Sequence, residues 1–96
     1  MYYLVYYELA DNYAEAREPV RALHFKHIES YLDSGEFIMG GALETAEEAV
    51  LVFKTSKERV EEFIQKDPYI RSGVVTGWRI RKWNIAITNG ELRIEN

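Results

Sequence analysis

The chain has 96 residues, of which 47% are hydrophobic, 14% aromatic and 29% charged, with a formal net charge of −4. This composition is too apolar for a disordered chain and too charged for a membrane span, and the negative charge argues against nucleic acid as a partner. The absence of cysteine excludes disulfides and thiolate metal sites. The length fits a single domain over residues 1–96, with a core of about residues 2–87 and a short tail over 88–96.

The N-terminal segment predicts a strand. Tyr2–Leu9 is dense in aromatic and β-branched residues and lacks the features of a signal peptide, so we expect a cytoplasmic protein. Both faces of this strand are apolar, which is typical of a strand that is covered on both sides. Because so short a chain has a limited core, we expect a second copy to supply part of that cover in a homodimer.

A helix is predicted next. Residues 11–15 read as a polar turn, and a helical period runs from about Glu18-Pro19 to Asp33, where Ser34-Gly35 ends it. One stripe of this helix is apolar, and it includes both histidines of the chain. The stripe consists of Val20, Leu23, His24, His27, Ile28 and Tyr31.

Two further strands, a helix and a last strand complete the predicted order. Glu36–Met39 ends at Gly40-Gly41, where a bulge, bend or close ligand approach is expected, and Ala49–Phe53 pairs with it in antiparallel fashion. The second helix begins with a capping box formed by Thr55 and Glu58 and ends at Asp67-Pro68. Residues 69–73 then read as a turn, and residues 74–87 as a long strand. This order predicts an α+β fold of the ferredoxin-like βαββαβ type, with one antiparallel sheet and two helices on one face.

His24 is the strongest candidate for chemistry. An imidazole on an apolar stripe is suited to general acid–base work, although a core histidine that bonds a backbone carbonyl is the ordinary alternative, above all for His27. Asp67 lies at the unfavourable end of a helix dipole, which suggests a compensating partner such as His24. The alternative is that Asp67 before Pro68 is ordinary turn chemistry.

Other site types have little support in the sequence. No acidic residue completes a metal site with His24 and His27, and no phosphate-binding or nucleophile motif is present, so we expect neither a metal nor a cofactor. Arg79 and Arg81 make one face of the last strand basic. Exposure of this face to solvent is the ordinary explanation, and binding of an anionic substrate is the alternative.

Several segments together carry a family resemblance: residues 2–6, Arg21 to His24, Gly35, residues 40–43, Asp67-Pro68-Tyr69 and Gly73-Val74. They resemble the YciI-like (YCII-related) family of small bacterial and archaeal proteins. The resemblance implies a dimeric α+β barrel related to muconolactone isomerase, and it places the catalytic histidine and aspartate proposed for the family on His24 and Asp67.

We therefore expect an enzyme that transfers protons on a small molecule, in lyase, isomerase or dehalogenase chemistry, with His24 as base or acid and Asp67 orienting it. A non-catalytic module that binds or senses a metabolite, and a purely structural dimer, are the alternatives. The expected partners are a second copy and a small-molecule ligand, without nucleic acid or membrane. The residues expected to bind substrate are Tyr6, Arg21, Gly41 and Tyr69.

Overall fold

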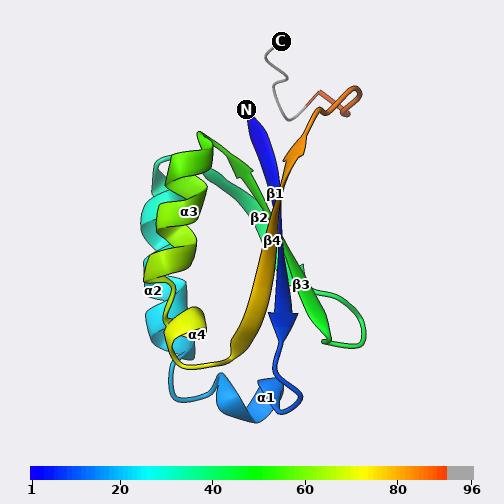
Figure 1. Ribbon diagram of the computed structural model, residues 1–96. Coiled ribbons are helices and arrows are strands. Elements are labelled where there is room, and N and C mark those ends of the chain that lie inside the picture. Colours follow the sequence, from blue (N-terminus) through cyan, green and yellow to red (C-terminus); the bar gives the residue numbers. More distant parts are fainter. Residues whose placement is uncertain (91–96) are drawn as a thin grey trace.

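The computed structural model describes residues 1–90, in which helices cover one face of a four-stranded antiparallel sheet (Figure 1). The strand order is β2-β3-β1-β4, which confirms the predicted ferredoxin-like fold. Of the predicted tail, residues 91–96 lie outside the described residues. The strands are β1 (Tyr2–Leu9), β2 (Phe37–Ala42), β3 (Glu48–Lys54) and β4 (Val75–Trp83), and the helices are α1 (Tyr13–Ala16), α2 (Arg21–Asp33), α3 (Lys57–Lys66) and α4 (Pro68–Arg71).

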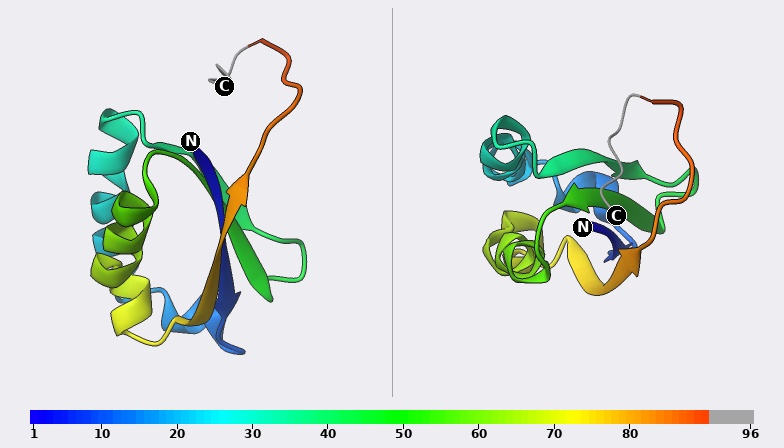
Figure 2. Two further views of the ribbon diagram at one scale, coloured as in Figure 1. Left: turned by 45° about the horizontal axis from the view of Figure 1, so that its top comes forward. Right: turned by 90° about the horizontal axis from the view of Figure 1, so that it is seen from above.

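The two faces of the sheet differ in their cover. Figure 2 shows α2 and α3 side by side on one face, while no helix lies over the other, which we call the bare face. Alternate residues of β1 divide between the faces: Tyr3, Val5 and Tyr7 pack in the core below the helices, whereas Leu4 and Tyr6 point to the bare face. Within residues 1–90 no helix has the length and apolar character needed to cross a membrane.

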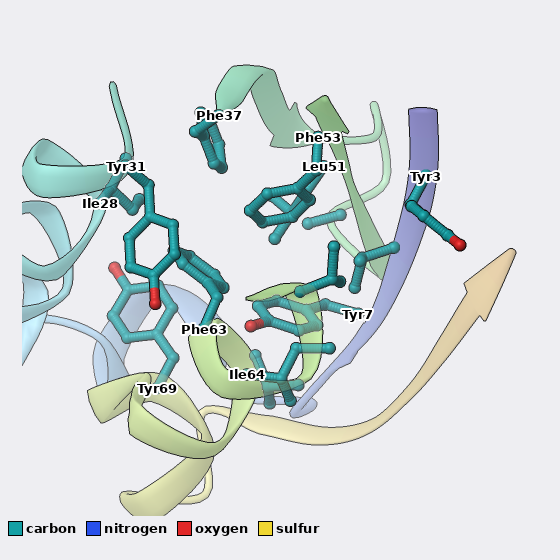
Figure 3. Close-up of a cluster of buried hydrophobic side chains, with 14 of the residues drawn as sticks. Tyr3, Tyr7, Ile28, Tyr31, Phe37, Leu51, Phe53, Phe63, Ile64 and Tyr69 are labelled. Atoms are coloured by element: carbon teal, nitrogen blue, oxygen red, sulfur yellow. The ribbon is translucent and has the colours of Figure 1, made fainter. Parts of the chain in front are cut away.

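Aromatic rings fill the space between the sheet and the helices (Figure 3). Phe63 of α3 is fully buried, and its ring centroid lies 4.9 Å from that of Phe53 and 5.0 Å from that of Tyr31. Such edge-to-face pairs stabilise a fold by about 0.5–1.5 kcal/mol each beyond the burial of their area. His27 belongs to this cluster, because its Nε2 donates to the carbonyl oxygen of Phe63 at 2.8 Å. His27 is therefore a core histidine that bonds a backbone carbonyl, which was the ordinary alternative to a role in chemistry.

Glycine lets β2 continue beyond its predicted end. The strand runs through Gly40 and Gly41 to Ala42, with an irregularity in pairing between Phe37 and Met39. A Cβ atom on Gly40 would lie only 2.7 Å from Cδ2 of Leu51 and 2.9 Å from Cζ of Phe37, so a larger residue here would force these side chains to shift. A Cβ atom on Gly41 would meet nothing within 4 Å. Close packing against β3, rather than a bend, explains the first glycine.

Helix boundaries also differ from those predicted. Residues 11–15 and 69–73 were expected as turns, but they contain the short helices α1 and α4, and α2 begins at Arg21, after the proline. Ser56, not Thr55, caps α3, because its hydroxyl accepts the Arg59 backbone N–H at 3.3 Å. Leu23, which was predicted to be buried, is 58% exposed. Only His24, Ile28 and Tyr31 of α2 are buried, so the buried stripe of this helix is narrower than the apolar one.

Thr55 instead belongs to a polar cluster around Glu36, which lies just before β2. The Glu36 carboxylate accepts hydrogen bonds from the Thr55 hydroxyl at 2.7 Å and from Arg59 Nε and Nη2 at 2.9 Å each. The Ser34 hydroxyl adds a fourth at 2.7 Å. These hydrogen bonds, led by those from Arg59, lower the pKa of Glu36 from 4.5 to about 2. The cluster joins the end of α2 to the start of α3.

The Glu36 cluster should make stability depend on pH in a defined range. Because the pKa of Glu36 is lowered on folding, its stabilisation is complete above 4.5 and is lost as the pH falls towards about 2. Urea unfolding should show that Glu36→Gln is less stable than the parent at pH 6 and that this difference shrinks steadily between pH 4.5 and 2. Glu29→Gln, which alters an exposed carboxylate on α2, serves as the control. If the free energy of unfolding of Glu36→Gln lay below that of the parent by the same amount at every pH, the stabilisation could not come from the ionised Glu36 carboxylate.

Candidate functional site

The structure brings His24 and Asp67 into contact, although 43 positions separate them in the chain. Nδ1 of His24 lies 2.7 Å from Oδ1 of Asp67. His24 sits in the first turns of α2 and Asp67 at the junction of α3 and α4, and α2 packs against α4. Both side chains are buried, His24 with 8% of its surface exposed and Asp67 with none. Short distance and exclusion of water together make this a strong hydrogen bond.

Asp67 owes its position to the proline that follows it. The residue before a proline is pushed out of the α region, and the Asp67 backbone is extended, with φ −70° and ψ 121°. α3 therefore ends at Lys66, and Asp67 becomes the N-cap of α4, where Oδ1 accepts the Tyr69 backbone N–H at 3.0 Å. Asp67 thus lies at the C-terminal end of α3, as expected, but its carboxylate also caps the N-terminal end of α4, where a negative charge is favourable.

Tyr7 is a further member of the site that the sequence did not single out. Its hydroxyl donates to Oδ2 of Asp67 at 2.9 Å, from the middle of the buried face of β1. Burial, together with the neighbouring Asp67 carboxylate, raises the pKa of Tyr7 far above its ordinary value. Tyr7 thus remains a hydrogen-bond donor at any physiological pH. Its signal in the sequence is that a tyrosine on a buried strand face needs a polar partner for its hydroxyl.

The contacts of Asp67 determine how the His24 ring is used. The carboxylate accepts hydrogen bonds from Tyr7 and from the Tyr69 backbone, so Nδ1 of His24 carries a hydrogen and donates it to Asp67. Nε2 remains the nitrogen that can act on another molecule. The Tyr69 side chain stacks on the imidazole, with ring centroids 3.6 Å apart and planes 7° from parallel. The ring is therefore fixed by a hydrogen bond at its edge and by an aromatic ring on its face.

A cavity of about 360 Å³ lies beside His24, between α2 and strands β1, β2 and β3, with residues of α1 and α4 also in its wall. This volume is in the range of pockets that hold small molecules, about 300–1,000 Å³. Its wall is mainly aromatic and aliphatic, with two arginines. Of the residues expected to bind substrate, Arg21, Gly41 and Tyr69 line it, together with Tyr7, Tyr13 and Arg17, which the sequence did not indicate.

Tyr6 does not share this cavity. It points to the bare face of the sheet, where the Arg79 guanidinium lies 4.6 Å from the centre of its ring. Arg79 also lies 3.6 Å from a carboxylate oxygen of Glu48, so it has partners of its own on the bare face. Within residues 1–90, no group of three or more side chains could hold a metal ion.

Known structures share this fold at low sequence identity. A 5-chloro-2-hydroxyhydroquinone dehydrochlorinase from Burkholderia phenoliruptrix, in complex with 2,5-dihydroxybenzoquinone, aligns with a TM-score of 0.71 and 18% identity over 86% of this chain and 93% of its own. A NIPSNAP family protein from Agrobacterium tumefaciens aligns with a TM-score of 0.61 and 13% identity over 96% and 97% of the two chains. At these identities the likeness shows the fold alone.

Sequence comparison identifies the family. No curated protein matches the chain at a significant level. The profile of the YCII-related domain, however, matches residues 1–84, which include every element of the sheet and every helix described above. The chain belongs to the YCII-related family.

Proposed function

We propose that the protein is an enzyme that transfers a proton on a small organic molecule bound in the cavity beside His24. The observation that carries this proposal is the buried contact between His24 and Asp67 at the wall of a cavity of suitable size. A histidine whose Nδ1 is held by a carboxylate and whose Nε2 can reach a ligand is a well-suited general base. His24 and Asp67 are assigned as the catalytic residue and its positioning partner.

The proposed reaction begins when Nε2 of His24 accepts a proton from a C–H or O–H group of the substrate. The bonding electrons stay on the substrate, and the negative charge of Asp67 stabilises the imidazolium that forms. His24 then returns the proton to a different substrate atom, which gives an isomerisation. In an elimination, a leaving group such as chloride departs with its electron pair, and His24 releases the proton to water. Tyr7 and Tyr69 take no proton in this scheme, but they hold Asp67 and the imidazole in place.

The dehydrochlorinase that shares the fold supports a cyclic or aromatic substrate for this protein. Its name records the loss of chloride from a hydroxylated ring, and its structure contains 2,5-dihydroxybenzoquinone. A cavity walled by Phe25, Phe37 and Tyr69 suits a cyclic or aromatic molecule of similar size. Substrate binding is accordingly assigned to Arg21, Gly41 and Tyr69, and not to Tyr6.

Two other functions share parts of this site. A binding or sensing module would use the same cavity, with His24 only as a hydrogen-bonding group, and turnover separates it from the enzyme. A purely structural dimer would have a filled space around His24, whereas a cavity of about 360 Å³ lies there. The open space favours a protein that binds a ligand.

The enzyme proposal predicts that His24→Gln and Asp67→Asn reduce turnover more than stability. The assay incubates the protein in D₂O with small cyclic hydroxy compounds, beginning with 5-chloro-2-hydroxyhydroquinone, and records deuterium incorporation and chloride release. Removing the general base should slow the reaction about 100-fold or more. Asp67→Asn should slow it less, because the amide oxygen can still accept from His24 and from the Tyr69 backbone.

His27→Gln is the matched control, since His27 lies on the same helix but bonds the Phe63 carbonyl. This variant should lose stability and keep its turnover per folded molecule. Turnover that survives in His24→Gln would overturn the enzyme proposal. If no compound reacts but several bind, the binding module replaces it.

We also propose that the bare face of the sheet forms the interface of a homodimer. Met39 is 54% exposed and Trp83 43% exposed on this face, around a hollow of about 620 Å³ that Leu4, Val50 and Val52 also line. Residues 84–90 extend beyond β4 (Figure 1), and Ile87 among them is 87% exposed. An apolar surface of this extent is typical of an interface, and a second copy would cover it.

Light scattering at micromolar concentration should therefore give the mass of a dimer. Met39→Lys should shift the protein to the monomer, because it places a charge in the proposed interface. Leu23→Lys, at an equally exposed apolar position on α2, should leave the dimer intact. A monomeric parent protein, or dissociation by Leu23→Lys alone, would contradict the proposed interface.

A further inference from the structure

The cavity beside His24 differs in charge from the rest of the molecule. Its lining includes the guanidinium groups of Arg17 and Arg21 and no aspartate or glutamate, although the chain as a whole carries a formal net charge of −4. Asp67 lies behind His24 and is fully buried, so it presents no carboxylate to the cavity. Two cations at an apolar wall favour a ligand with a negative charge.

Arg17 is held in place but incompletely paired. Its Nη1 donates to the Tyr13 hydroxyl at 3.1 Å, and its guanidinium carbon lies 4.9 Å from the centre of the same ring. Its Nε is buried and has no hydrogen-bond partner within residues 1–90. A carboxylate oxygen of Glu18 lies 4.0 Å from this Nε, on a side chain that is 67% exposed, so water screens the pair. Glu18 therefore offsets the positive charge of Arg17 only weakly, and an anionic oxygen in the cavity would offset it better.

Arg21 approaches the same region from α2. It precedes His24 by three residues, so the two share one face of the helix, and its guanidinium carbon lies 5.3 Å from the centre of the Phe25 ring. The field of both arginines reaches Tyr69: burial raises the pKa of this tyrosine, and Arg17 and Arg21 oppose the rise. Both cations are thus close to the ring that stacks on His24.

We infer that the substrate is a small organic anion, a carboxylate or phenolate, whose charged oxygens bind Arg17 and Arg21 while its apolar body rests against the cavity wall. This inference rests on the proposed function, because it names the substrate class of the same site. The arrangement places the anionic group one helical turn from His24. Two guanidinium groups there also stabilise the negative charge that develops when His24 removes a proton. Arg17 and Arg21 are therefore binding residues that favour the charged transition state.

Benzoate and benzamide test this inference as a pair of probes of nearly equal shape, one anionic and one neutral. Titration of the full chain, followed by ¹H–¹⁵N NMR, should show benzoate binding at least about tenfold more tightly than benzamide, with shifts centred on residues that line the cavity. Arg17→Gln and Arg21→Gln should each weaken benzoate about tenfold, as expected for loss of a hydrogen bond to a charged group, and leave benzamide unchanged. Lys26→Gln, which removes an exposed cation from the same helix, is the control and should change neither.

The inference is overturned if benzamide binds as tightly as benzoate, if neither binds in the cavity, or if the arginine variants keep the preference. It is also overturned if His24→Gln abolishes the preference, because the imidazole would then be what recognises the anion. Since benzoate is not turned over, these results leave proton transfer untouched. Conversely, benzoate could bind through the two arginines while no compound shows turnover that depends on His24. That result would overturn the proposed enzyme and keep the anion site.

Discussion

The Asp67 carboxylate is the group on which the rest of the site depends. It is fully buried, and it accepts hydrogen bonds from Tyr7 on β1, from His24 on α2 and from the Tyr69 backbone at the start of α4. A buried charge is tolerated only where partners replace its hydration. The three donors meet this requirement, and in doing so they fix a strand and two helices relative to one another. Removing the carboxylate would leave three buried donors without an acceptor, and each would lower the free energy of unfolding by about 1–3 kcal/mol.

The same contacts prepare the site for chemistry. Because Nδ1 of His24 donates its hydrogen bond to Asp67, Nε2 is left without a hydrogen, and the residue lies at the wall of the cavity. Tyr69 connects the two sides of the site, since its backbone binds Asp67 and its ring stacks on His24. Arg17 and Arg21 then give the cavity its positive charge. The fold thus places an imidazole, a buried carboxylate and two guanidinium groups around one space of molecular size.

Patterns along the sequence predict the elements of this fold well, because period-two and helical periodicities report directly on which faces are buried. They also indicate His24 and Asp67, through a polar residue on an apolar stripe and an Asp-Pro helix end. Tyr7 and Arg17 were not predicted. A tyrosine on a buried strand face indicates that its hydroxyl has a polar partner but not which one, and an arginine in a loop becomes distinctive only when the chain is folded. Leu23 and Gly40 could not be predicted for a different reason. The width of the buried stripe on α2 and the close packing of β2 against β3 depend on contacts between residues that are distant in the sequence.

The proposed chemistry depends on the orientation of the His24 imidazole, which NMR of its ring nitrogens measures. In a ¹⁵N-labelled protein at a pH where the ring is neutral, long-range ¹H–¹⁵N correlations distinguish the two tautomers. The hydrogen bond to Asp67 predicts that Nδ1 carries the hydrogen and that Nε2 is unprotonated, with this preference weakened in Asp67→Asn. A ring that carries its hydrogen on Nε2 in the parent protein would show that Asp67 does not hold the imidazole in this orientation.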